Sequence, residues 1–106
     1  MIRAGQFRHY LELQSVTRVP DENGARVDTW TTYARAWARI EGISAREIER
    51  AKSFGNNTSL KVTIRYRPGI SAKDQIKFGT RRFLINGILN PEEANVTLEL
   101  YCSEVG

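Results

Sequence analysis

The chain is short of cysteine, of proline and of long apolar runs, and each shortage excludes a class of protein. It has one cysteine among 106 residues, so no internal disulfide can form, and a lone thiol fits a reducing compartment. The longest aliphatic or aromatic stretches are tripeptides such as residues 83–85, too short to cross a bilayer. Residues 1–5 include a basic side chain with no apolar run behind it, so we expect no signal peptide. These shortages predict a protein that stays in the cell that makes it, or in something assembled there.

What is present is an ordinary globular composition with an uneven charge. Hydrophobic residues make up 41% and charged residues 26%, which excludes a disordered chain, and the length suits one domain spanning residues 1–106. All 16 Lys and Arg lie at or before Arg82, together with 8 of the 12 acids, a net charge of +8. Residues 83–106 carry four glutamates and no base, a net charge of −4. Such polarity fits nucleic-acid binding, and it equally fits contact between one end of the chain and the other end of a neighbour.

Short segments with period-two alternation dominate the chain and predict β-strands with one apolar and one polar face. The apolar positions of the three clearest segments are His9, Leu11 and Leu13; Leu60, Val62, Ile64 and Tyr66; and Val96, Leu98, Leu100 and Cys102. A turn at residues 21–24 (DENG) predicts a hairpin of residues 7–18 with 26–33. Further strands are expected at residues 34–41, around 75–78 and at 81–88. Several short strands separated by turns predict a mainly β fold, a small barrel or sandwich.

One segment, residues 43–58, departs from this pattern and predicts a short helix inside a long inter-strand loop. Ser44 and Glu47 have the spacing of a capping box, and Gly55 marks the end of the helix. The expected helix has about ten residues, with Arg46, Arg50 and Ser53 on its polar side and only Ile48, Ala51 and Phe54 on its apolar side. A polar loop of residues 56–58 follows it.

The residues offer no catalytic, metal or cofactor site, and an enzyme is not expected. His9 is the single histidine and falls on an inward face, where a satisfied or interfacial role is expected. Cys102 ends an inward alternation and is expected to be an inert small hydrophobe. Glu92 and Glu93 follow a proline, as in a solvated turn. Zinc spacing, phosphate-binding glycine loops and nucleophile motifs are absent from the sequence.

Two features fit contact with nucleic acid. Trp37 lies between Arg35 and Arg39 on one strand face, a pattern that stacks bases and holds phosphates. A basic stretch, relieved only by Asp74, contains Arg65, Arg67, Lys73, Lys77, Arg81 and Arg82. The alternative is that Trp37 belongs to the core or to an interface and that the charges line solvated strand faces.

Five segments in register resemble a known family. They are residues 3–14 (RAGQFRHYLELQ), 37–47 (WARIEGISARE), 64–70 (IRYRPGI), 83–91 (FLINGILNP) and 98–102 (LELYC). In this order and spacing they resemble the phage head–tail joining family, the head-closure or stopper proteins of siphophages and their prophage relatives. The resemblance covers essentially the whole chain, although the helix–loop segment is variable in such proteins.

The resemblance implies a β-barrel subunit of a homo-oligomeric ring, dodecameric in the virion and monomeric when isolated. The ring would lie at the head–tail interface of a virion assembled in the bacterial host cytoplasm. It would seal the packaged-DNA channel and dock the tail, with portal and adaptor proteins, tail proteins and double-stranded DNA as partners, and with no cofactor and no membrane. The long loop of such proteins projects toward the channel, and here it matches residues 43–58. The resemblance therefore implies channel, gate or adaptor contacts by Ser44, Arg46, Glu47, Arg50, Lys52, Phe54, Asn56 and Asn57.

A ring built from one repeated heterologous contact needs two different surfaces on every subunit. The acidic last strand would then face a neighbour's basic surface or the lumen. The residues expected at a DNA or subunit interface are Arg35, Trp37, Arg39, Arg65, Arg67, Glu99 and Glu104. Two other functions stay open: a tail-completion or terminator protein, which would bind the tail tube, and a small nucleic-acid-binding barrel, whose DNA binding would weaken steeply with salt.

Overall fold

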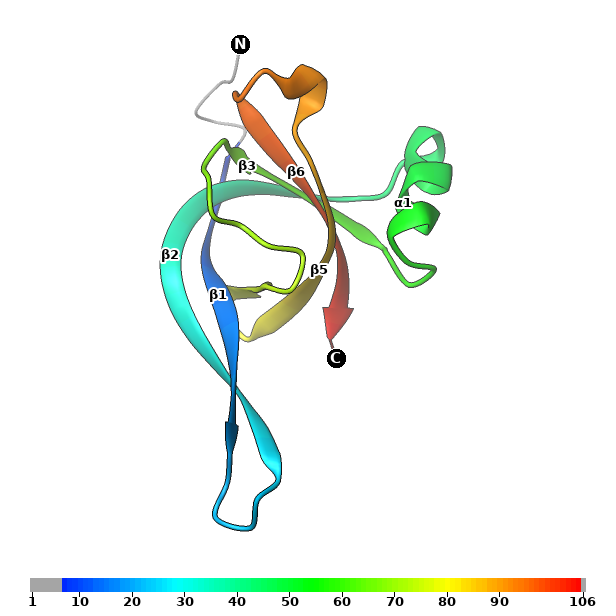
Figure 1. Cartoon of the computed structure of the whole chain (residues 1–106). Helices are drawn as coiled ribbons and strands as arrows, with labels where there is room; N and C mark the ends of the chain where they lie inside the picture. The colour runs from blue at the N-terminus through cyan, green and yellow to red at the C-terminus, as the bar shows by residue number, and fades with distance from the viewer. Residues whose placement is uncertain (1–6, 106) are drawn as a thin grey trace.

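Six antiparallel strands close into a barrel in a computed structural model that describes residues 7–105 (Figure 1). The order around the barrel is β1-β2-β3-β6-β5-β4. The strands are β1 His9–Pro20, β2 Arg26–Gly42, β3 Leu60–Arg65, β4 Gln75–Phe78, β5 Arg81–Leu89 and β6 Thr97–Val105. The prediction of a mainly β fold with one short helix is confirmed. The expectation about residues 1–5, and residues 3–6 of the first family-like segment, lie outside the described residues.

Inward-facing side chains from all six strands fill the barrel, as the period-two alternation predicted. The fully buried members include Leu11, Leu13, Ala38, Val62, Ile64, Ile76, Phe83, Leu100 and Cys102. His9 is half-buried and meets the ring of Phe78 edge-on, with the ring centroids 5.1 Å apart. The core therefore explains the three alternating segments without assigning them any chemistry, except at two positions. The prediction is wrong for Tyr66 and Val96, which are 39% and 53% exposed because they lie just outside the ends of β3 and β6.

The prediction of separate strands at residues 26–33 and 34–41 is wrong, because both belong to the single 17-residue strand β2. Leu13 pairs with Ala34 while Gln14 pairs with Thr32, so Tyr33 is an extra residue on β2. Such a bulge bends a strand and increases its twist without ending it. Figure 1 shows the resulting curve, along which β2 passes from the hairpin to the barrel wall.

The β1–β2 hairpin reaches well beyond the barrel. After Gln14, β1 pairs only with β2, so the last six residues of the strand form a two-stranded arm about 20 Å long. The arm projects below the barrel in Figure 1. Its turn is the predicted one, and the Asp21 carboxylate accepts hydrogen bonds from the N–H groups of Asn23 and Ala25.

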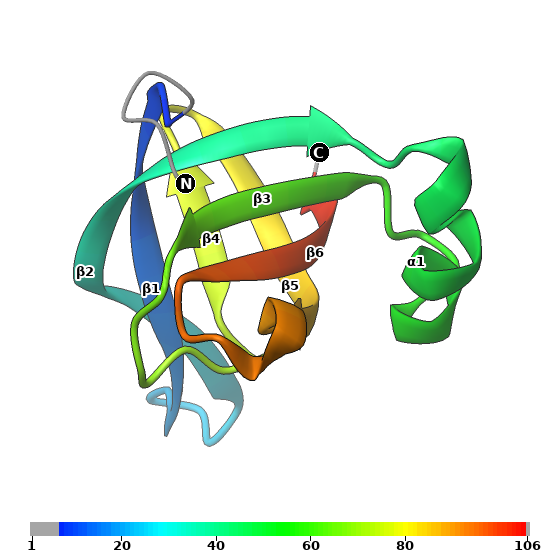
Figure 2. The ribbon, with the colours of Figure 1, turned by 90° about the horizontal axis from the view of Figure 1, so that it is seen from above.

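The predicted helix lies between β2 and β3 and stands at one side of the barrel (Figure 2). It consists of a 3-10 turn, Ala45–Glu47, followed by α1, Ile48–Phe54, which together give the expected ten helical residues. The capping box of Ser44 and Glu47 is present. A second 3-10 turn, Pro91–Glu93, connects β5 with β6 and leaves both of its glutamates exposed, as expected of a solvated turn. Within residues 7–105, no helix is long and apolar enough to cross a membrane.

Candidate functional site

The insertion of residues 43–58 rests on a row of residues that crosses the outside of the barrel. Gly87 of β5 pairs with Tyr101 of β6, Tyr101 pairs with Lys61 of β3, and Lys61 pairs with Glu41 of β2. We call these four residues the anchoring row. All four face outward, yet Tyr101 is fully buried because the insertion covers it. The base of the insertion is therefore packed against the outside of the barrel.

Glu47 fixes the start of the helix to the middle of this row. Its carboxylate accepts a hydrogen bond from Lys61 Nζ at 2.5 Å and another from the hydroxyl of Ser44 at 2.6 Å. Partial burial alone would raise the pKa of Glu47, but hydrogen bonds from Lys61 and Ser44 outweigh it and lower the pKa to about 2. The Tyr101 hydroxyl also donates to Glu47, at 3.2 Å.

Lys61 is the cation around which three carboxylates gather. Besides Glu47, the Glu41 carboxylate lies 3.6 Å and the Glu99 carboxylate 3.8 Å from Lys61 Nζ. Burial opposes the charged ammonium and would lower its pKa, whereas the surrounding carboxylates raise it above the usual value. The lysine side chain is only 12% exposed, so this attraction is less screened than that of a surface pair. Lys61 therefore ties the insertion to strands β2 and β6.

Phe54 fixes the end of the helix to the other end of the row. Its ring packs on Tyr101 with the centroids 5.3 Å apart and lies directly over Gly87. A Cβ atom at Gly87 would lie 2.1 Å from Phe54 Cδ1, so the ring fits only because residue 87 has no side chain. The polar loop after the helix is held as well, since the Asn86 amide donates to the Thr58 hydroxyl at 2.8 Å.

The eight residues expected at channel or adaptor contacts divide into two groups. Glu47 and Phe54 point toward the barrel as anchors, and the remaining six are exposed. Burial raises the pKa of the Tyr101 hydroxyl, and the nearby Arg50 opposes this rise. The exposed set is Ser44, Arg46, Arg50, Lys52, Asn56 and Asn57.

Sequence reasoning missed the anchoring row. Alternation places Tyr101 and Lys61 on solvated faces, and nothing local in the sequence shows that another segment covers them. The one available signal was Gly87, because a glycine within a strand often marks the close approach of another element.

The predicted interface residues on β2 lie on the outside of the barrel. Trp37 is 56% exposed and is therefore no core residue; its ring lies against that of Tyr10 at 5.0 Å. Arg35 is 3.7 Å from Glu12, and Arg39 Nε is 3.3 Å from the Glu41 carboxylate.

The other predicted interface residues lie elsewhere. The Arg65 guanidinium sits 5.8 Å from the Phe7 ring, and Arg67 is half-buried. Glu99 lies beside Lys61, and Glu104 receives two hydrogen bonds from Arg81, at 2.8 and 2.9 Å. The predicted set therefore forms no single site, and part of the acidic last strand is neutralised within its own chain.

The remaining sequence candidates for chemistry are accounted for structurally. Burial raises the pKa of the Cys102 thiol to about 12, which keeps it protonated and unreactive. Among the described residues, no three or more His, Cys, Asp or Glu side chains gather as metal ligands would.

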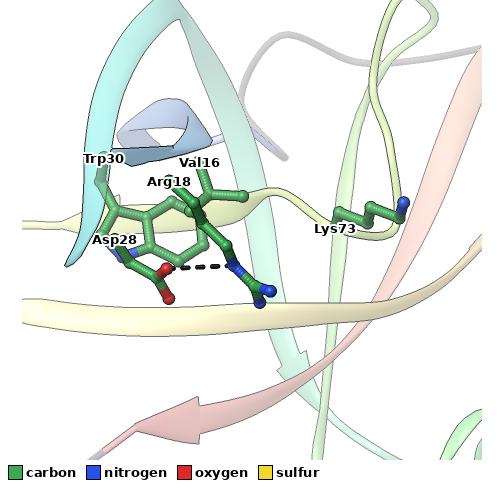
Figure 3. A pocket seen from close by; sticks show the side chains of 5 residues that line it. All are labelled: Val16, Arg18, Asp28, Trp30 and Lys73. Atoms are coloured by element: carbon green, nitrogen blue, oxygen red, sulfur yellow. Dashed lines mark ion pairs between the residues drawn. The ribbon is translucent and has the colours of Figure 1, made fainter. Parts of the chain in front are cut away.

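The arm carries an open hollow that the sequence did not reveal (Figure 3). Val16 pairs with Trp30 and Arg18 with Asp28 across the two strands, so the four side chains share one face. Arg18 Nε lies 3.1 Å from the Asp28 carboxylate. Figure 3 marks this ion pair with a dashed line and shows Lys73 on the far side of the hollow. The hollow combines an indole and a guanidinium, which are enriched at protein contacts, with an aspartate and a lysine, which are depleted there, so its composition assigns it no role.

A comparison with protein families decides what this barrel belongs to. Residues 2–105 match the model of the phage head completion protein. The chain belongs to the phage head completion protein family. The resemblance to head–tail joining proteins is thereby confirmed, and the family places the chain among the structural proteins of the phage virion.

One named relative and two solved structures are similar to this chain over most of its length. The head completion protein gp7 of Enterobacteria phage HK97 is 27% identical over 103 residues, 92% of each chain. The solution structure of protein SF1141 from Shigella flexneri 2a superposes with a TM-score of 0.73 at 28% identity, covering 97% of this chain and 96% of that one. A chain in the virion of a native gene transfer agent particle has the same fold, with a TM-score of 0.61 at 16% identity, over 92% of this chain and 94% of that one. The head completion family and fold thus extend across the whole chain.

Proposed function

We propose that the chain is the head-closure, or stopper, subunit of a head–tail connector. Copies assemble as a homo-oligomeric ring, dodecameric in the virion, beneath the portal and adaptor proteins. The ring closes the channel over the packaged double-stranded DNA and offers a surface to the tail. The isolated chain is a monomer in the host cytoplasm, and the ring appears only on a filled head.

The observation that carries this proposal is the construction of the insertion. Its base is fixed to the barrel by Glu47 and Phe54, while its outer side presents basic and amide side chains to solvent. A rigid scaffold that carries one exposed segment is a common way to place a binding element precisely. We therefore assign channel or adaptor contact to Arg46, Lys52 and Asn56, which are exposed and which no anchoring contact uses.

The experiment adds purified protein to DNA-filled heads that lack it, then measures DNA retention and tail joining. The test variant replaces Arg46, Lys52 and Asn56 by alanine and keeps both anchors. The matched control replaces Arg26 and Lys77, exposed basic residues outside the insertion, by alanine. We expect the control to close heads and the test variant to leak DNA or reject tails. Equal activity of the two variants would overturn the assignment to the insertion.

The same assay separates a stopper from a tail terminator. A stopper binds the vertex of a filled head before any tail is present, whereas a terminator binds purified tail tubes. Imaging the vertex of tailless heads after addition of the wild-type chain should reveal a ring over the channel. A ring found only on free tails would refute the stopper role.

A further inference from the structure

The uneven charge of the sequence is only partly neutralised in the fold. Of the four glutamates after residue 82, Glu99 lies beside Lys61 and Glu104 is paired with Arg81. Glu92 and Glu93 are exposed, and within residues 7–105 no ion pair involves them. Val96 follows them and is 53% exposed. We call these three residues the acidic turn; it combines two unpaired carboxylates with an exposed apolar side chain.

A surface of opposite character lies on β1 and β2. Tyr10 and Trp37 are 51% and 56% exposed, and their rings form one apolar platform. Arg35 and Arg39 flank this platform on the same outer face. We call these four residues the aromatic face. Each arginine lies near a carboxylate of its own chain, Glu12 at 3.7 Å and Glu41 at 3.3 Å, but the two side chains are still 56% and 39% exposed, so a neighbour's carboxylates can reach them in competition with these pairs. Single exposed hydrophobic residues are ordinary, but an adjacent Trp–Tyr pair bordered by arginines has the composition of a protein-binding hot spot.

The two surfaces complement each other and lie apart on the chain. The aromatic face offers apolar area and guanidinium groups, and the acidic turn offers an apolar side chain and carboxylates. In the barrel order β3 separates β2 from β6, and Figure 2 shows the turn before β6 on a different side of the barrel from the β1–β2 pair. Two different complementary surfaces on one subunit make a heterologous contact, which closes into a ring or continues as a filament.

We propose that the aromatic face of one copy binds the acidic turn of the next copy. Val96 packs on the Trp37 ring, and Glu92 and Glu93 meet Arg35 and Arg39. This inference rests on the proposed ring function and identifies the two surfaces that build the ring. Removal of a central Trp from such a contact lowers the association constant by about 30-fold.

The first test identifies the partner of residue 37 directly. The photo-crosslinking residue benzoylphenylalanine replaces Trp37 in the full chain, and this protein is mixed with isotopically labelled wild-type copies on filled heads. After illumination, mass spectrometry should find the adduct on residues 91–97 of a labelled copy. Trypsin leaves residues 83–106 as one peptide because no Lys or Arg follows Arg82, so a glutamate-specific protease localises the adduct. An adduct with DNA, with a portal or adaptor protein or with another segment of the chain would overturn the proposal.

The second test uses reversal of charge. Glu92→Lys with Glu93→Lys should abolish ring assembly on heads, and so should Arg35→Glu with Arg39→Glu, whereas a chain that carries all four changes should recover it. Glu22→Lys, at the exposed tip of the arm, serves as the matched control and should assemble normally. Normal assembly by either reversed pair, or no recovery in the combined chain, would count against the contact. Circular dichroism checks that every variant is folded.

Mixing the two reversed variants adds a test that only a heterologous contact passes. Each variant retains one intact surface, and its reversed surface complements the reversed surface of the other variant, so neither should assemble alone but an equal mixture should form rings in which the two alternate. A mixture that forms no rings would overturn the proposal. Wild-type protein that fails to join heads at all would overturn the proposed function and this inference together, whereas wild-type rings with an adduct elsewhere would overturn this inference alone.

Discussion

Gly87→Ala is the substitution that tests most directly how the insertion is held to the barrel. The new methyl group would lie 2.1 Å from Phe54 Cδ1, whereas non-bonded carbon atoms sit about 3.5–4.0 Å apart. The ring must therefore leave its place over β5. Since Phe54 also packs on Tyr101, displacement of the ring loosens the end of the helix.

The expected size of the effect follows from two opposing contributions. Overpacking of a tight contact costs about 1–3 kcal/mol, while alanine in a strand gains about 0.5–1 kcal/mol over glycine because it loses less entropy on folding. We expect Gly87→Ala to lower the free energy of unfolding by about 1–2 kcal/mol. In a Phe54→Ala background the clash is gone, and the same substitution should be neutral or slightly stabilising. The two changes should therefore couple by about 2 kcal/mol.

Urea unfolding followed by circular dichroism measures all four members of this cycle. Gly42→Ala is the matched control, because residue 42 ends β2 at the base of the insertion and a Cβ there meets nothing within 4 Å. Tryptic cleavage in the insertion gives a local measurement. Gly87→Ala should accelerate cleavage after Arg46 and Lys52 by about tenfold or more, since about 1.4 kcal/mol of local destabilisation is a factor of ten in the open population.

Equal stability of Gly87→Ala and Gly42→Ala, with no coupling to Phe54→Ala, would refute this reasoning. It would mean that the Phe54 ring does not occupy the surface of β5 in solution. The anchored insertion on which the proposed function rests would then lose one of its two attachments.

Three further predictions concern single contacts. The pKa of Glu47 is lowered from 4.5 to about 2, so its contribution to stability is complete above pH 4.5 and is lost as the pH falls toward 2. Between pH 5 and 2 the free energy of unfolding of the Glu47→Gln variant should therefore fall by about 2 kcal/mol less than that of the wild type, measured by urea unfolding. An unchanged pH profile in the variant would contradict this prediction. Burial raises the pKa of Cys102 to about 12, so a thiol reagent at about pH 8 should react only as fast as the protein unfolds, and rapid labelling of the folded protein would show otherwise. The Tyr33 hydroxyl donates to Asp74 at 2.6 Å, so Tyr33→Phe should lower the free energy of unfolding by about 1–2 kcal/mol. The control, Tyr66→Phe, removes a hydroxyl with no such contact. Equal stability of the two variants would refute the role of this hydrogen bond.

The strands could be predicted from sequence because each buries alternate side chains in the same core. The exception is β2, for which the sequence predicts two strands at residues 26–33 and 34–41. From Trp30 to Ala38 its less exposed positions alternate without a break, and Tyr33 is one extra residue opposite β1, so the bulge bends the strand without ending it. The bulge is defined by the pairing with β1, and no local pattern within residues 26–41 reveals it.

The location of the insertion was also predictable, because capping and helix-ending residues act within a few positions of one another. Its attachment was not. Lys61 and Tyr101 are brought under the helix by pairing among β2, β3 and β6, and no local pattern encodes contacts between segments so far apart in sequence. Alternation assigns a residue to the outside of a barrel, but it does not reveal what covers the outside.

The division of the insertion into anchors and exposed residues has a functional consequence. The side chains of Glu47 and Phe54 make contacts within the chain. Substitutions there should therefore lower the stability of the fold, and head closure should fall only as a result. Arg46 and Lys52 are exposed and make no anchoring contact, and surface changes of this kind usually alter stability by less than about 0.5 kcal/mol. Arg46→Ala with Lys52→Ala should therefore leave urea unfolding unchanged while head closure falls, whereas Glu47→Gln should shift unfolding even in the isolated chain. If both variants shifted unfolding equally, the outer side of the helix would be part of the scaffold, and the surface that meets the connector would have to be sought on the arm.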